Sequence, residues 1–223
     1  MQEDTVPSRS TLNLLGLRLD VRALVILVSS TLLLTLDYYH VFLPQEILGT
    51  FLRAKPVERV GYYLIIPLVI IVLLFRERPG AYGFQIGNWR EGLKWTAVII
   101  GVGLPVLYLS ARTPAMVEYY KRLGGSVPQV VVNAVLDLFG WEFFFRGFIL
   151  FGLLRVAGPI AVVFQAVPFA LAHLGKPELE TMSTIFGGTL FGWVAWRSNS
   201  FLYPFLIHFG VYVIVVLVAT AGP

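Results

Sequence analysis

The chain has 223 residues, of which 57% are hydrophobic and 13% are charged, with a formal net charge of +4. A soluble domain carries about a quarter charged residues, so this composition, with a mean hydropathy of +0.77, indicates one integral membrane domain over residues 1–223. The chain has no cysteine, which excludes thiol catalysis, disulfide bonds and thiolate metal ligands. Lys and Arg flank apolar runs and form no basic stripe, so no nucleic-acid partner is expected.

A polar stretch at residues 1–21 opens the chain. It lacks the apolar core and cleavage site of a signal peptide, so the first membrane helix is expected to act as an uncleaved insertion signal. Seven apolar segments follow, and they predict an all-α fold, a polytopic transmembrane bundle of about seven helices within a range of six to eight. Their approximate bounds are residues 22–43, 60–75, 96–110, 128–154, 158–174, 181–196 and 202–220.

The connections between these segments predict structure at the membrane surface. Residues 37–40 are expected to form an interfacial belt, and residues 76–95 and about 116–123 to form short amphipathic interfacial helices. Gly188 and Gly192 predict close helix packing through a G-x-x-x-G face. With Arg146 set aside, the loops on the N-terminal side carry nine Lys and Arg against seven, which favours a cytoplasmic N-terminus.

The fourth segment carries charged residues inside an aromatic run. Glu142 and Arg146 are four residues apart, which places them on one face of a helix, and Asp137 lies about one turn earlier. A charge near the bilayer centre costs about 2.5–3.5 kcal/mol, so such residues usually pair and usually have a function. A purely structural ion pair is the alternative interpretation of Glu142 and Arg146.

Two histidines on later segments extend this set. His173 lies near the end of the fifth segment and His208 near the start of the seventh. Two imidazoles and a carboxylate from three helices predict a site that activates water, with a base, donors for an oxyanion and exclusion of bulk solvent. Glu142, His173 and His208 could also hold a zinc ion, although no H-E-x-x-H motif calls for a metal and no cofactor is required. Each histidine alone also fits an interfacial role.

Three motifs in this order resemble the CPBP family of intramembrane proteases, which includes CAAX-processing prenyl-protein endopeptidases. The family motifs are Glu-Glu-x-x-x-Arg, Phe-x-x-x-His and His-x-x-x-Asn/Asp. The matching positions are Trp141-Glu142-Phe-Phe-Phe-Arg146, Phe169-Ala-Leu-Ala-His173 and His208-Phe-Gly-Val-Tyr212. The resemblance covers residues 128–216 as a catalytic core. It implies an endopeptidase in the cytoplasmic (inner) membrane of a prokaryote that cuts a membrane-anchored protein or peptide.

Two positions depart from the family pattern. Trp141 stands where the family has the glutamate credited with activating water, and Tyr212 replaces the final Asn or Asp. Glu142 is about 100° around the helix from position 141, so it could take the base role after a modest rotation. Three other carboxylates are auxiliary candidates, each with a structural interpretation as a polar helix start or a solvated loop: Asp137, Glu178 and Glu180.

The resulting hypothesis assigns a role to each member of the site. Glu142, with His173, polarises a water, His208 and Tyr212 stabilise the oxyanion, and Arg146 orients Glu142. One alternative is a catalytically inactive relative that binds a peptide or lipid, confers immunity or acts as a scaffold, which the missing first glutamate would suit. Another is a proton-coupled transporter, which the lack of an internal repeat disfavours. The sequence leaves the natural substrate and the oligomeric state open.

Overall fold

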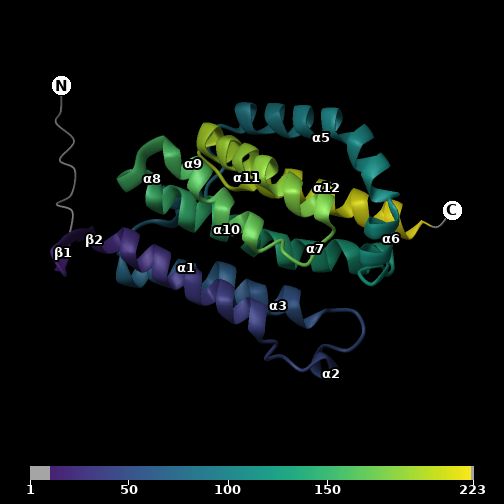
Figure 1. Ribbon diagram of the computed structural model, residues 1–223, viewed down its shortest axis with the longest axis horizontal. Helices are drawn as coiled ribbons and strands as arrows, with labels where there is room; N and C mark the ends of the chain where they lie inside the picture. Colours follow the sequence, from purple (N-terminus) through teal and green to yellow (C-terminus); the bar gives the residue numbers. More distant parts are fainter. Residues whose placement is uncertain (1–10, 222–223) are drawn as a thin grey trace.

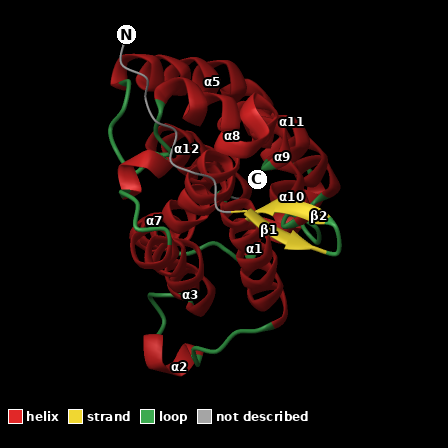
Figure 2. Ribbon diagram, turned by 90° about the vertical axis from the view of Figure 1, so that its left-hand side faces the viewer, coloured by secondary structure: helices red, strands yellow, loops and turns green. Residues whose placement is uncertain are grey.

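The helices are arranged in three layers that share one long axis (Figures 1 and 2). The computed structural model describes residues 11–221, so the first ten positions of the predicted polar segment lie outside the described residues. α1 (Val21–Tyr39) and α3 (Ala54–Val60) form one outer layer, α5 (Trp89–Ala111) lies in the other, and α7 (Val127–Glu142) runs between them. The predicted all-α, polytopic class is confirmed.

Five runs within the described residues are long and apolar enough to cross a membrane. They are Val21–Tyr39, Ala54–Leu74, Trp89–Ala111, Val127–Leu171 and Leu202–Thr220. The count differs from the seven predicted segments, because the fourth run takes in two of them and the sixth predicted segment lies in a 21-residue helix that is not among the five.

The remaining elements lie within these runs or connect them. The α-helices are α2 (Gln45–Leu48), α4 (Ile66–Val69), α6 (Pro114–Lys121), α8 (Gly152–Ala157), α9 (Ala161–Phe164), α10 (Ala166–Leu171), α11 (Glu178–Ser198) and α12 (Leu202–Thr220). The π-helical segments are η1 (Gly61–Ile65), η2 (Ile70–Leu74) and η4 (Phe143–Phe151), and the 3-10 segments are η3 (Pro79–Tyr82) and η5 (Gly158–Ile160). Of the predicted interfacial helices, the one near residue 116 corresponds to α6.

The stretch before α1 was predicted only as polar, and its described part forms a β-hairpin. β1 (Thr11–Leu14) pairs antiparallel with β2 (Leu17–Asp20). The turn residues Leu15 and Gly16 have φ of 51° and 81°, the positive values that a two-residue hairpin turn requires. Asp20 ends the hairpin and also caps α1 through its side chain. The hairpin therefore fixes where the first membrane helix begins.

Charged side chains join the outer layer to α7. Arg59 of α3 donates from Nη2 to Asp37 at 2.9 Å and from Nη1 to Asp137 at 2.9 Å. Lys55 adds a 3.2 Å ion pair with Asp37. The expectation of an interfacial belt at residues 37–40 was wrong for Asp37, which is buried, whereas the two tyrosines that follow it are exposed. Asp37 is buried because two cations from α3 compensate its charge.

The central helix changes its geometry where the charged motif begins. Ser126 and Gln129 form a capping box at its start, with Pro in the first turn. α7 then continues after Glu142 into η4, whose nine residues are all buried. π-helical turns often occur at functional sites. Here the π segment places three consecutive phenylalanines, residues 143–145, in the core.

Close packing of α11 against α9 and α10 depends on two glycines. A Cβ atom at Gly188 would lie 2.8 Å from a ring carbon of Phe169, and one at Gly192 would lie 2.4 Å from Nε2 of Gln165. The predicted G-x-x-x-G packing is therefore present. The close approach also lets Gln165 donate a 2.7 Å hydrogen bond to the carbonyl of Gly188.

Candidate active site

Glu142 lies at the centre of a buried charged group. Its Oε1 accepts a hydrogen bond from Nη1 of Arg146 at 3.0 Å and another from Nδ1 of His208 at 2.6 Å. Both members of the Glu142–Arg146 pair are fully buried, whereas the His208 side chain is 11% exposed. The predicted pair within the helix is present, and it reaches α12 through the histidine.

Aromatic rings surround the guanidinium of Arg146. Its Cζ lies 3.9 Å from the ring centroid of Phe169 and 5.3 Å from that of Phe191. Its Nη2 donates to the carbonyl of Gly188 at 3.4 Å. The ring faces attract the cation in a region from which water is excluded. This arrangement holds Arg146, and through it Glu142, in one position.

His173 follows the end of α10 and is buried. Its Nδ1 lies 2.7 Å from the carbonyl oxygen of Phe169, one turn earlier. A carbonyl only accepts hydrogen bonds, so Nδ1 carries the proton and Nε2 is left as the acceptor. The rings of His173 and His208 stack with centroids 6.4 Å apart and an interplanar angle of 28°. The two imidazoles from α10 and α12 thus come together as predicted.

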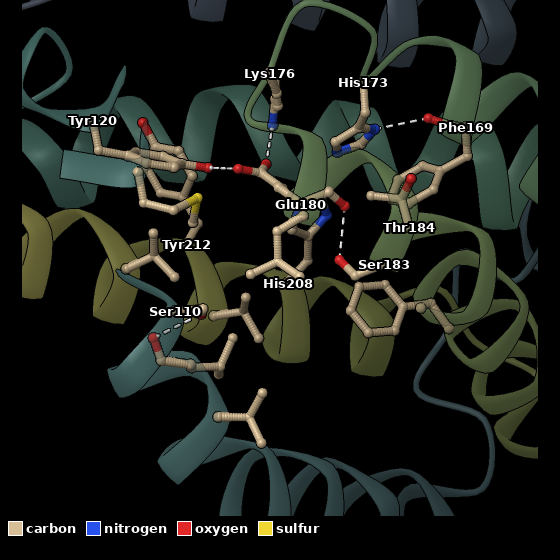
Figure 3. A pocket seen from close by; sticks show the side chains of 18 residues that line it. Ser110, Tyr120, Phe169, His173, Lys176, Glu180, Ser183, Thr184, His208 and Tyr212 are labelled. Atoms are coloured by element: carbon tan, nitrogen blue, oxygen red, sulfur yellow. Dashed lines mark hydrogen bonds and ion pairs between the residues drawn. The ribbon is translucent and has the colours of Figure 1, made fainter. Parts of the chain in front are cut away.

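Both histidines line one cavity of about 240 Å³ (Figure 3). Its walls come from α5, α6, α11, α12 and the end of α10 with the loop that follows, and most of the lining surface is apolar although half of the lining residues are polar or charged. The polar and charged lining residues are Ser110, Tyr120, His173, Lys176, Glu180, Ser183, Thr184, His208 and Tyr212. An apolar cavity with a few polar groups at one place is the usual form of a binding or active site.

Glu180 and Tyr212 are predicted site residues that the structure places in this cavity. The carboxylate of Glu180 accepts a hydrogen bond from the hydroxyl of Tyr120 at 2.7 Å and forms an ion pair with Lys176 at 2.8 Å. Burial, with the charge of Glu180, raises the pKa of Tyr120 well above its usual value, so the phenol keeps its proton and donates. Tyr212 packs edge-to-face against Tyr120, with centroids 6.2 Å apart.

Four residues singled out from the sequence do not line the cavity. Asp137 is engaged by Arg59, Glu178 is exposed, and Glu142 lies behind His208 together with its partner Arg146. Trp141 is buried with its ring 4.6 Å from the guanidinium of Arg59. That ring therefore lies between His173 and the cluster formed by Arg59, Asp37 and Asp137, which is called the Arg59 cluster below.

Zinc was the metal that the sequence left open. Within residues 11–221, no group of three or more His, Cys, Asp or Glu side chains is arranged to hold a metal ion. Both histidines line the cavity, but Glu142 is sealed behind His208 and does not. The three proposed metal ligands therefore do not face one common space.

Two cavity residues were missed from the sequence. Tyr120 gave no signal, because its contact with Glu180 spans 60 positions. Lys176 did give one, since Lys176 and Glu180 have the four-residue spacing of a helical ion pair. Gly175 and Pro177 flank Lys176 and interrupt helices, so the spacing was not interpreted as a helical ion pair.

Comparison with known proteins gives one result. Residues 123–214 match the model of a family described as type II CAAX prenyl endopeptidase, Rce1-like. The matched segment contains every residue of the charged group and both histidines. Searches of curated proteins and of solved structures found no match. The resemblance to the CPBP proteases is confirmed over this segment, and the chain is an integral, multi-pass membrane protein.

Proposed function

We propose that this chain, whose residues 123–214 belong to the Rce1-like type II CAAX prenyl endopeptidases, is an intramembrane endopeptidase. Its reaction is hydrolysis of a peptide bond in a membrane-associated protein or peptide. The observation that carries the proposal is the pair of stacked imidazoles at one largely apolar cavity. In each imidazole, Nδ1 already makes a hydrogen bond within the protein.

His173 is suited to hold the attacking water. Its Nδ1–H is fixed on the carbonyl of Phe169, so Nε2 can accept a hydrogen bond from water in the cavity. This bond orients a lone pair of the water oxygen toward the carbonyl carbon of a substrate. The neutral tautomer is set by the helix itself, because the accepting carbonyl is one turn earlier on α10.

His208 is suited to stabilise the oxyanion that forms. Its Nδ1–H donates to Glu142, which fixes the orientation of the ring. In the protonated form of the ring, Nε2–H would donate to the tetrahedral oxygen, with the hydroxyl of Tyr212 as a second donor. Arg146 holds Glu142 in place from the opposite side.

This assignment changes the role predicted for Glu142. The sequence hypothesis made it the base that contacts water. Its side chain is fully buried and does not line the cavity, so we propose that it positions His208 instead. The proposal includes a location in the inner membrane of a prokaryotic cell, which membrane fractionation of the native host would test.

The test uses the full chain in liposomes with a panel of anchored peptides. The panel contains a peptide ending in a prenylated cysteine followed by three residues, an acylated peptide and a transmembrane peptide, and cleavage is read by mass spectrometry. Wild type is expected to cut at least one, and H173A and E142A to lose most of the activity. No cleavage by wild type would leave the inactive relative as the better description. Equal cleavage by all three proteins would show that neither His173 nor Glu142 carries the activity. A chelator arm asks whether cleavage depends on a metal.

A further inference from the structure

The proposed reaction needs a group that takes the proton of the attacking water. A carboxylate in contact with the cavity is one kind of side chain that can do this. Among the described residues that line the cavity, Glu180 is the one carboxylate. It lies in the first turn of α11, on the same cavity as His173 and His208 (Figure 3).

The surroundings of Glu180 fix its carboxylate at the cavity wall. Oε2 accepts from Tyr120 of α6 at 2.7 Å, and Oε1 accepts from Lys176 at 2.8 Å. Each carboxylate oxygen has two acceptor sites, so each keeps one for another donor. The side chain is 16% exposed, which leaves it accessible, whereas Glu142 is sealed in the protein.

The neighbouring groups hold an ionised carboxylate in place at the cavity wall. The titratable and charged side chains that line the cavity with it are Tyr120, His173, Lys176, His208 and Tyr212. Lys176 compensates the charge, and the N-terminal end of α11 adds the favourable sign of the helix dipole. Glu178, two residues earlier in the same turn, is exposed and outside the cavity, so it shares the dipole but not the site.

We infer that Glu180 is the catalytic carboxylate of this protein and takes the part that position 141 lacks. The inference rests on the proposed function. The water O–H bond breaks as the proton passes to Glu180 and the water oxygen bonds to the substrate carbonyl carbon, which gives a tetrahedral oxyanion beside His208. When the C–N bond breaks, Glu180 returns the proton to the leaving nitrogen, so one carboxylic acid and one amine are formed and Glu180 is again ionised.

The decisive comparison is E180Q against E178Q in the liposome panel. E180Q keeps the shape and the hydrogen-bond acceptor but not the base, so cleavage is expected to fall by about 100- to 10,000-fold. E178Q changes the neighbouring carboxylate and is expected to cleave like wild type. Equal cleavage by the two variants, with wild type active, would overturn the inference and leave the proposed function intact. A wild type that cuts no peptide overturns the function and the inference together.

Chemical rescue separates a base from a structural role. E180A removes the carboxylate from the cavity wall, so added formate is expected to raise the cleavage rate of E180A at least tenfold. Chloride at equal ionic strength is expected to leave that rate unchanged. Formate should leave E178A unchanged. An E180A protein that melts like wild type, is inactive and does not respond to formate would show that Glu180 is structural. If E180A does not fold, the isosteric E180Q comparison decides the question.

Discussion

α7 takes part in two charged clusters five residues apart, one partly and one fully buried, and they differ in how completely their atoms are paired. In the Arg59 cluster, both oxygens of Asp37 and both oxygens of Asp137 accept hydrogen bonds. In the Glu142 cluster, Oε2 of the glutamate and Nε of Arg146 are buried without a hydrogen-bond partner among the described residues.

The difference separates two uses of charge in a membrane. The Arg59 cluster joins three helices, and its charges compensate one another, which is what a structural connection requires. The Glu142 cluster is less completely paired, and it passes through His208 to a cavity. Unpaired buried polar atoms call for an explanation, and a reaction site is one. Each of the following experiments perturbs one cluster and uses the other as its reference.

Removing an imidazole should have the largest effect. H173A is expected to lower cleavage by about 100- to 10,000-fold, because the water loses the acceptor that orients it. H208A should cost about 100- to 1,000-fold through the lost oxyanion donor. Liposome cleavage measures both. The matched control is H40A, since His40 is exposed beyond the end of α1. Cleavage by H173A at the level of H40A would contradict the site.

E142Q should affect both stability and cleavage. It removes one charge from a fully buried pair and leaves Arg146 uncompensated, which typically costs about 3–5 kcal/mol. It also removes the carboxylate acceptor that holds the His208 ring. Denaturant unfolding in detergent measures the first effect and the peptide panel the second. A stable, fully active E142Q protein would show that the group is neither structural nor chemical.

D137N should lower stability by less than E142Q does, and it should leave cleavage nearly unchanged. Arg59 keeps Asp37 as its partner, so the loss is limited to the charge-assisted bonds to Asp137, about 1.5–3 kcal/mol. Cleavage per folded molecule is expected to stay within about twofold of wild type. If D137N lowered specific activity as far as E142Q does, the two clusters would have to be treated as one.

W141F should have the smallest effect. Trp141 does not line the cavity, and its Nε1 makes no hydrogen bond among the described residues. Phenylalanine keeps most of the packing against Arg59 and the edge-to-face contact with His173 at 5.8 Å. A loss of about 1 kcal/mol with unchanged cleavage is expected. A large loss of cleavage would mean that the indole holds the His173 ring in its working orientation.

The sequence was most informative where contacts are local or repeat a known motif. The Glu142–Arg146 pair follows from helical spacing alone, and the meeting of His173 with His208 followed from the family resemblance. The spacing of Gly188 and Gly192 predicted close helix packing, because glycine has no side chain and lets two helices approach most closely.

The sequence was least informative where partners come from distant helices. Asp37 beside two tyrosines at a helix end has the pattern of a membrane interface, and only its contact with Arg59, 22 positions away, shows that it is buried. Glu180 looked like a loop carboxylate because its partner Tyr120 belongs to another element. The hairpin before α1 was missed because residues 1–21 were interpreted as a whole by their polar character, although leucines alternate with polar residues along both short strands.

The short run of α9 and α10 has a consequence for the sidedness of the reaction. Residues 161–171 rise only about 17 Å at 1.5 Å per residue, against a hydrocarbon core of about 30 Å. The chain then leaves the helix at His173 and turns through Gly175, whose φ is +90°. Non-helical backbone at that depth is tolerated only against protein or water. The cavity beside the histidines, whose wall includes α6 at the end of the molecule away from the hairpin (Figure 1), offers room for such water. Water for hydrolysis would then be held at that end of the molecule.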